Sequence, residues 1–292
     1  MSSQIQIRAF FDESTNTISY LVADPCTKQA LVIDPVLDFD YESGRVTAAS
    51  ADRILEAART AGWEIALILE THIHADHLSA ASYIKQQTRA PIGIGEHVQD
   101  VQAIFAPRFN LSDVSRDGAE FDHLWRDGDR FSFGNQFVDV MHTPGHTPAC
   151  VSYRIGDAVF VGDTLFMPDY GTARADFPGG SAPALYQSIQ RLLALPPETR
   201  MFLCHDYLPE GRRQYTWETT VAEQRLCNVH VHDGVTQTEF VAMRRKRDAS
   251  LSAPALLLPS IQVNMRAGRL PKAESNGTRY LKVPLTANAD LP

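Results

Sequence analysis

The chain has 292 residues, of which 44% are hydrophobic and 21% charged, a composition typical of a globular protein with a sizeable core. The net charge of −8 gives no general attraction to nucleic acid, and no apolar stretch reaches the roughly 20 residues that a membrane-spanning helix needs. The start of the chain lacks a signal-peptide pattern, and the four cysteines form no Cys-x-x-Cys pair. We therefore expect a cytoplasmic protein without a disulfide framework, a nucleic-acid partner or a membrane partner.

The first part of the chain alternates strands with helices. Apolar runs between polar turns predict strands over residues 5–11, 18–23, 30–33, 65–70 and 91–95. Helical spacing or helix-favouring composition predicts helices over 49–61, 78–84 and 97–105.

The second part repeats this order. Strands are expected over 131–140, 150–155, 158–161 and 201–204, and helices over 184–195, 217–227 and 239–247. A β-rich part followed by helices, twice over, predicts a mixed α/β (α+β) protein built as a four-layer αββα sandwich. We place a catalytic domain at residues 1–235 and a C-terminal extension at 236–292. The extension is expected to pack on the core or at a dimer interface, and its basic run Arg244–Arg247 is interpreted as a solvated helix face.

A group of potential metal ligands follows the strand at 65–70. His72, His74, Asp76 and His77 stand within six positions, at the strand's carboxyl end. Open α/β sheets place their chemistry at this end of their strands, and neutral imidazole and carboxylate groups bind transition metals. The alternative, a polar surface loop, does not account for this spacing. The segment therefore predicts a metal centre.

Three later segments have the same form. His146 follows a strand and a glycine, Gly145, that permits a tight turn; Asp163 and His205 each follow an apolar strand. Taken singly, a strand-terminal histidine is more often a packing residue than a ligand. Taken together with the first segment, these positions supply five histidines and two aspartates at strand ends.

With these motifs in place, residues 5–235 resemble the metallo-β-lactamase superfamily. The His-x-His-x-Asp-His motif at 72–77 is complete, and His146, Asp163 and His205 follow in the expected order. The resemblance implies the αββα fold with a metal site between the sheets. Since members of one fold perform many reactions, it leaves hydrolase and oxygenase activities both open.

One interpretation uses every candidate ligand for two zinc ions. His72, His74 and His146 would hold one ion, and Asp163 would bridge to the second. The remaining side chains, Asp76, His77 and His205, would complete the second site. Such a pair activates hydroxide, as in thioester hydrolases of the glyoxalase II type.

A finer resemblance points to the persulfide dioxygenases, also called sulfur dioxygenases. The segments Gly171–Phe177, Cys204–Tyr207 and Val263–Gly268 resemble motifs of that family, and Asp163–Tyr170 is similar to bacterial members labelled β-lactamase-like hydrolases. The resemblance implies a reaction in which glutathione persulfide, O2 and water give sulfite and glutathione.

The same resemblance implies one ferrous ion per chain, held by His72, His146 and Asp163 as a two-histidine, one-carboxylate triad with open positions. His74, Asp76, His77 and His205 would then orient ligands and water instead of binding a second metal. Nothing in the residues themselves shows why these four should leave the second site empty.

Glutathione carries two carboxylates, so a cationic recognition group is expected. Arg174 is the candidate by its place in the family motif, against the alternative of a structural ion pair with Asp176. Tyr207 would donate a hydrogen bond to the substrate. The animal enzymes carry an arginine near the position of residues 228–230, which this chain lacks, and His230 or a tail residue such as Arg266 would replace it. We expect a homodimer, because the apolar tail needs a surface to pack on. A third function, as a metal-bearing binding or regulatory protein, accounts poorly for the complete ligand set.

Overall fold

The computed structural model describes residues 4–285. Its strands are β1 (Gln6–Asp12), β2 (Thr17–Ala23), β3 (Gln29–Ile33), β4 (Val36–Asp40), β5 (Arg45–Thr47), β6 (Glu64–Leu69), β7 (Leu78–Ser79), β8 (Ile92–Gly95), β9 (His123–Trp125), β10 (Arg130–Phe133), β11 (Gln136–His142), β12 (Val151–Ile155), β13 (Ala158–Phe160), β14 (Arg200–Phe202) and β15 (Glu218–Thr220). Its helices are α1 (Ala49–Ala61), α2 (Ala81–Thr88), α3 (Val98–Arg108), α4 (Ala182–Leu193), α5 (Val221–Cys227), α6 (Gln237–Asp248) and α7 (Leu257–Asn264).

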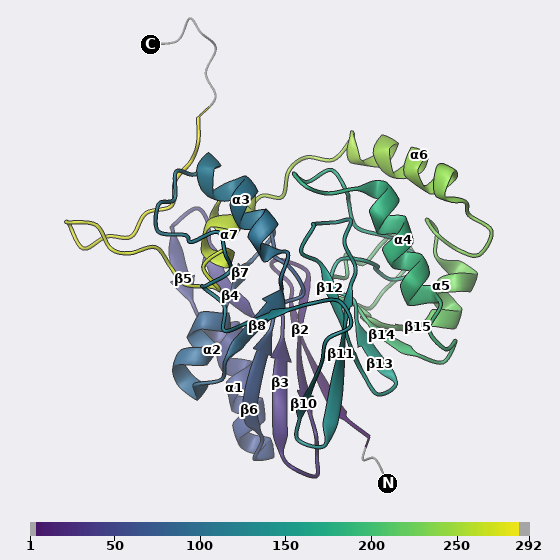
Figure 1. The fold of residues 1–292 in the computed structure, drawn as a ribbon, viewed down its shortest axis with the longest axis horizontal. Coiled ribbons are helices and arrows are strands. Elements are labelled where there is room, and N and C mark those ends of the chain that lie inside the picture. Colours follow the sequence, from purple (N-terminus) through teal and green to yellow (C-terminus); the bar gives the residue numbers. More distant parts are fainter. Residues whose placement is uncertain (1–3, 286–292) are drawn as a thin grey trace, which may run out of the picture.

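Two six-stranded sheets lie face to face between two layers of helices. The first sheet has the order β1-β2-β3-β6-β8-β9 and the second β10-β11-β12-β13-β14-β15, while β5, β4 and β7 form a small third sheet. Helices α1, α2, α3 and α7 lie on the side of the first sheet, and α4, α5 and α6 on the side of the second (Figure 1). The predicted four-layer αββα sandwich is therefore confirmed.

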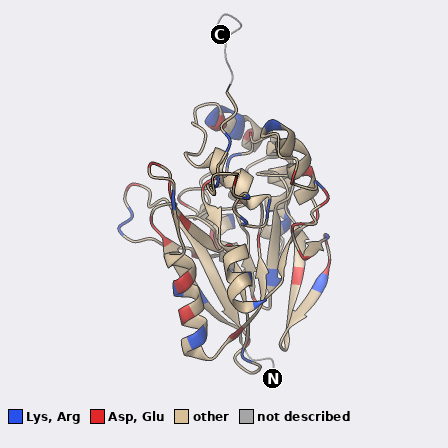
Figure 2. Ribbon diagram, turned by 90° about the vertical axis from the view of Figure 1, so that its left-hand side faces the viewer, with Lys and Arg blue, Asp and Glu red and all other residues tan. Residues whose placement is uncertain are grey.

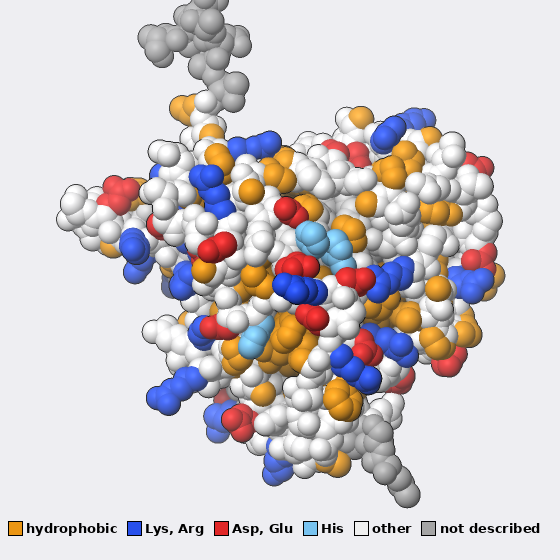
Figure 3. Space-filling model, viewed as in Figure 1, with side chains coloured by type: hydrophobic (Ala, Val, Ile, Leu, Met, Phe, Trp, Pro, Cys, Tyr) orange, Lys and Arg blue, Asp and Glu red, His pale blue; other side chains and the backbone are white. Residues whose placement is uncertain are grey.

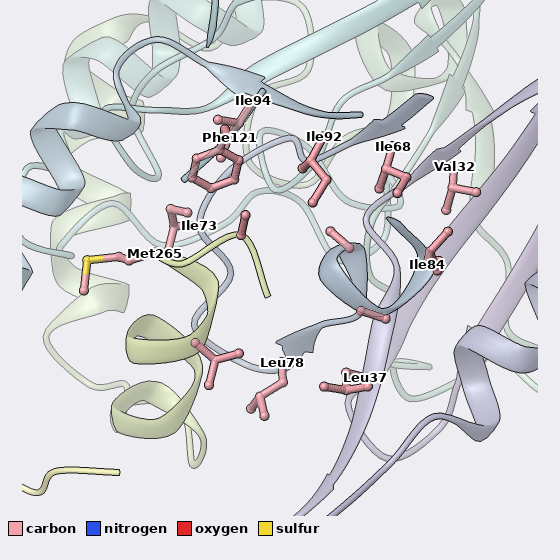
Figure 4. Packing of buried hydrophobic residues seen from close by; sticks show 14 of the residues in the cluster. Val32, Leu37, Ile68, Ile73, Leu78, Ile84, Ile92, Ile94, Phe121 and Met265 are labelled. Atoms are coloured by element: carbon pink, nitrogen blue, oxygen red, sulfur yellow. The ribbon is translucent and has the colours of Figure 1, made fainter. Parts of the chain in front are cut away.

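Three apolar clusters fill the spaces between these layers. One cluster joins the inner faces of the two sheets and includes Tyr20, Leu31 and Phe160, and another fills the space between the second sheet and α4, α5 and α6. The third lies under the helices of the first sheet. Figure 4 shows part of it, with Ile68 and Ile84 among the residues that fill it. Burial on both faces explains why the sheet strands read as nearly continuous apolar runs.

The C-terminal extension is part of this packing. Helix α7 contributes Ile261 and Val263 to the cluster under the first sheet, and Met265 follows just after the helix (Figure 4). Helix α6 begins with a capping box, in which the Thr236 side chain accepts from the Glu239 N–H and the Glu239 side chain accepts in return. It contributes Phe240 to the cluster of the second sheet. Residues after 236 thus contact both halves of the sandwich.

Several predicted elements have different forms in the structure. The expected strand 131–140 is a hairpin of β10 and β11, because Gly134 turns the chain with a φ of +54°. The expected helix 217–227 begins instead as β15, which pairs with β14, and only then becomes α5. The stretch expected to be helical from Leu78 starts as β7, which pairs with β4 before α2 begins.

The basic run Arg244–Arg247 is also not uniformly solvated. Arg244 is 1% exposed, and its guanidinium pairs with Asp248 at 2.7 Å. The prediction of a solvated face was therefore wrong for this arginine. Arg245, Lys246 and Arg247 are exposed.

The surface of the described residues carries charges of both signs. Basic and acidic side chains are interspersed along the ribbon and over the face seen in the space-filling view (Figures 2 and 3). Within residues 4–285, no helix is both long and apolar enough to cross a membrane.

Candidate metal centre

The candidate ligands gather at one end of the sandwich, where strands of both sheets stop. His72 follows β6, His146 lies in the loop between β11 and β12, Asp163 follows β13 and His205 follows β14. All four are buried. The sequence-predicted ligands are thus brought together from segments far apart in the chain.

His72, His146 and Asp163 form one compact part of this group. One ligand atom from each lies within 4.8 Å of the others, and the Asp163 Oδ2 is 3.8 Å from His72 Nε2 and 3.5 Å from His146 Nε2. His72 Nε2 and Asp163 Oδ1 are buried and have no hydrogen-bond partner among the described residues. Burial also lowers the pKa of His72, which favours the neutral imidazole that a metal needs. These residues fit a metal ion.

A relay of buried groups fixes the orientation of His72. The Thr71 hydroxyl donates to Asp34 Oδ2 at 2.8 Å, so its oxygen is left to accept from His72 Nδ1–H at 3.0 Å. With the proton on Nδ1, the lone pair of Nε2 faces Asp163. Gly162, with a φ of +52°, approaches so closely that a Cβ there would lie 2.6 Å from Thr71 Oγ1. The backbone next to Asp163 is thereby held against the relay.

His146 is oriented in the same way from the other side. Its Nδ1–H donates to the carbonyl oxygen of Arg174 at 2.8 Å, which leaves the Nε2 lone pair facing Asp163. Gly145 precedes it with a φ of +143°, and a Cβ there would lie 2.3 Å from the backbone of Leu185 in α4. Only glycine fits this close approach, as its position before His146 predicted.

The remaining ligand candidates form a second group beside the first. His205 Nε2 lies 3.3 Å from both Asp76 Oδ2 and Asp163 Oδ1, and His77 Nδ1 lies 3.3 Å from Asp76 Oδ2. The His205 Nδ1–H donates to the carbonyl oxygen of Asn16 at 3.0 Å, so the Nε2 lone pair faces the two carboxylates. Burial would raise the pKa of Asp76, but His205 and His77, when they are protonated, hold the pKa of Asp76 well below its ordinary value. This group has the chemistry of a second cation site.

His74 differs from the other histidines. Its Nε2 lies 3.0 Å from Asp34 Oδ1 and 3.4 Å from Glu70 Oε2, both buried carboxylates, while its Nδ1 has no partner among the described residues. Burial alone would lower its pKa, but Asp34 and Glu70 raise the pKa of His74 well above its ordinary value. His74 therefore joins the Asp34 relay on one side and faces the metal group on the other.

A residue of the extension fastens the loop that carries these histidines. The Asn264 side-chain amide donates to the carbonyl oxygens of His74 and His77, each at 2.8 Å, and its oxygen accepts from Ser79 N–H at 2.8 Å. All of these groups are buried. Sequence reasoning missed this role, although Asn264 stands inside the Val263–Gly268 segment that the family resemblance singled out.

A cavity of about 410 Å³ opens over the metal group. His146, Asp163 and Asp76 line one part of it, and residues 251, 252 and 254–256 from the link between α6 and α7 line another. The volume suits a small organic ligand. The extension therefore forms part of the wall of the candidate active site.

The predicted substrate contacts occupy different places. Tyr207 and Arg174 line the cavity. Burial raises the pKa of Tyr207, so its hydroxyl stays protonated and can donate. The Arg174 guanidinium is held by Asp176 at 2.6 and 2.9 Å and by the Ser252 carbonyl oxygen at 2.7 Å. The alternative weighed for Arg174, an ion pair with Asp176, is thus present.

His230 and Arg266 are not among the cavity-lining residues. The His230 Nδ1 accepts from the Thr172 N–H at 3.0 Å. Arg266 pairs with Asp113 at 2.7 Å. One or the other was expected to replace a substrate contact of the animal enzymes, and neither position supports that expectation.

This fold and this site define a metal-binding enzyme class. Residues 15–205 match the sequence model of the Metallo-beta-lactamase superfamily, and the chain belongs to that superfamily.

Curated relatives are similar over most of this chain. A probable metallo-hydrolase of Burkholderia pseudomallei is 52% identical over 96% of this chain and 99% of its own length. The protein named glyoxylase B2 of Dictyostelium discoideum is 48% identical over 98% of both chains. A beta-lactamase hydrolase-like protein of Xylella fastidiosa is 52% identical over 97% of this chain, which spans 65% of that longer relative.

Two further matches connect the chain with ETHE1. The human protein named persulfide dioxygenase ETHE1, mitochondrial, is 28% identical over 90% of this chain and 89% of its own. The crystal structure of ETHE1 from Myxococcus xanthus superposes with a TM-score of 0.72 at 30% identity, over 90% of this chain and all of that one. The predicted family relationship is therefore confirmed.

Proposed function

We propose that this chain is an iron-dependent persulfide dioxygenase that oxidises glutathione persulfide with O2 and water to sulfite and glutathione. The observation that carries the proposal is the group of His72, His146 and Asp163 beside an open cavity. Two imidazoles and one carboxylate are the ligand set of non-haem iron oxygenases, and they leave positions for two reactants. The similarity to ETHE1 over 90% of the chain supports the choice.

The residues around the triad suit this reaction. A bound ferrous ion would supply an acceptor for the soft persulfide sulfur and redox chemistry toward O2. Zinc also binds sulfur, but it has no redox chemistry. His72 and His146 are fixed with their Nε2 lone pairs toward Asp163, so the ligand set is ordered beforehand. Phe166 and Phe177 line the cavity and exclude water from its apolar part, while the protonated Tyr207 hydroxyl donates to the bound substrate.

A second candidate function is a dizinc thioester hydrolase. It is favoured by His205, whose Nε2 lone pair lies 3.3 Å from carboxylate oxygens of both Asp76 and Asp163. A cation between these groups would relieve the repulsion among them. The relative named glyoxylase B2 agrees with this alternative. Under our proposal, Asp76 and His205 orient ligands and water instead of binding a second metal.

Two assays on the same preparation separate these functions. The iron-loaded protein should consume O2 when glutathione persulfide is added and should leave S-lactoylglutathione intact. Hydrolysis of S-lactoylglutathione without O2 consumption would establish the hydrolase instead. Absence of both reactions would leave a binding or regulatory role.

A further inference from the structure

Three arginines line the cavity, and they differ in what they bind. Arg174, Arg244 and Arg247 all border it, whereas its lining carboxylates, Asp76 and Asp163, belong to the metal group. A cation in a ligand cavity is either held by the protein's own anions or left for an anion of the ligand. The pairing of each arginine therefore shows where a ligand's negative charge belongs.

Two of the three are engaged by the protein itself. The Asp176 carboxylate accepts from Nε and Nη2 of Arg174, and Nη1 of Arg174 donates to the Ser252 carbonyl oxygen. Arg244 is buried, pairs with Asp248 and donates to the Thr172 carbonyl oxygen at 3.0 Å. A ligand carboxylate would have to displace an existing partner to reach either one.

Arg247 is different. Within residues 4–285 its guanidinium makes no ion pair or hydrogen bond. It lies over the ring of Tyr170, whose centroid is 5.9 Å from the guanidinium carbon. Arg247 stands three residues after Arg244 on α6, so the two share the helix face toward the cavity. Arg245 and Lys246, which lie between them in the sequence, do not line the cavity.

A wall of stacked rings leads from Arg247 to the metal group. Tyr170 stacks on Tyr207 with a centroid distance of 4.7 Å, and Tyr207 stacks on His205 at 5.6 Å. A ligand lying along this wall would have one end at the metal group and the other at Arg247.

We propose that Arg247 binds a carboxylate of the substrate, so that the C-terminal extension selects anionic thiol derivatives over neutral ones. Arg174 is then a positioning residue, which holds the link at 251–256 through Ser252 and so keeps α6 and its arginine over the cavity. The inference rests on the proposed function only for the choice of glutathione as the probe.

The test is glutathione binding to the iron-loaded protein, measured by calorimetry without O2. Arg247→Gln should weaken binding about 10- to 100-fold, because it removes a charge-assisted contact. Lys246→Gln removes the same charge from the same last turn of α6 and should leave the dissociation constant within about twofold of wild type. Arg247→Lys should fall between them, since it keeps the charge but loses the fork. Equal melting temperatures would show that all variants are folded.

A second ligand, which lacks the negative charges of glutathione, tests whether the carboxylate is what Arg247 binds. The diethyl ester of glutathione should bind wild type and Arg247→Gln with the same, weaker affinity. Equal glutathione binding by Arg247→Gln and Lys246→Gln, undiminished binding of the ester to wild type, or no glutathione binding by wild type would each overturn the inference. Failure of the proposed function is a separate result, because it concerns O2 consumption and leaves these affinities unchanged.

Discussion

At the scale of single residues, the site depends on groups that set the protonation of its ligands. The Thr71 hydroxyl donates a hydrogen bond to Asp34 and accepts one from His72, and this fixes which nitrogen of His72 faces Asp163. Without that acceptor the ring can rotate or change tautomer. We predict that Thr71→Val lowers iron affinity about 10- to 100-fold with little change in fold.

A competition titration with an iron chelator measures this loss. Thr199→Val is the matched control, because Thr199 is also buried but lies before β14, outside the relay. Unchanged iron affinity in Thr71→Val would show that the relay does not orient His72.

His230 should make stability depend on pH. Burial and the charges of Arg244 and Arg247 lower the pKa of His230 to about 4, whereas an unfolded chain takes up this proton near 6.5. Between these values the unfolded state binds more protons, so the contribution of His230 to stability falls as the pH falls from about 6.5 to 4. Above this window it is constant.

Urea denaturation of wild type and His230→Asn at several pH values tests this sign. Asparagine does not titrate, and its side-chain oxygen can replace Nδ1 as acceptor for the Thr172 N–H. The stability of wild type relative to the variant should decrease toward pH 4. A difference that does not change with pH would contradict the assignment.

At the scale of elements, helix α7 holds the metal loop through Asn264. Asn264→Asp keeps the oxygen that accepts from Ser79 but places an acceptor against the carbonyls of His74 and His77. We predict a loss of about 2–5 kcal/mol in the free energy of unfolding, because buried carbonyl oxygens lose their donor. Thermal unfolding and iron content measure the effect. Asn276→Asp, an exposed counterpart in the same extension, should have little effect. Equal stability of the two variants would show that the hydrogen bonds of Asn264 do not hold this loop.

The sequence predicted the elements that local patterns determine. The helix at Ala49–Ala61 and the strands that carry the metal ligands were recognisable from apolar runs and their ends. Strand β15 was not, because its pairing with β14 is a tertiary contact that overrides the local pattern. Helix α7 was not predicted either; it contains Pro259 in its first turn, where proline is tolerated.

At the scale of the whole molecule, the grouping of the candidate metal ligands was predictable and the partners of the candidate substrate contacts were not. Ligands are marked by residue type and by their place at strand ends, which the sequence displays directly. Whether an arginine is paired within the protein or available to a ligand depends on partners that only folding brings near, such as Asp113 for Arg266 and Ser252 for Arg174. The unpaired Arg247 was hidden for the same reason. The homodimer, which no contact tests, stays a prediction.

The central claim is that one iron ion, held by His72, His146 and Asp163, is the working metal of this fold. The metal content of protein purified without O2 tests it most directly. We predict about one iron per chain in wild type and almost none in Asp163→Ala, since one of three ligands is lost. Two zinc ions per chain, with activity that needs both, would contradict the account.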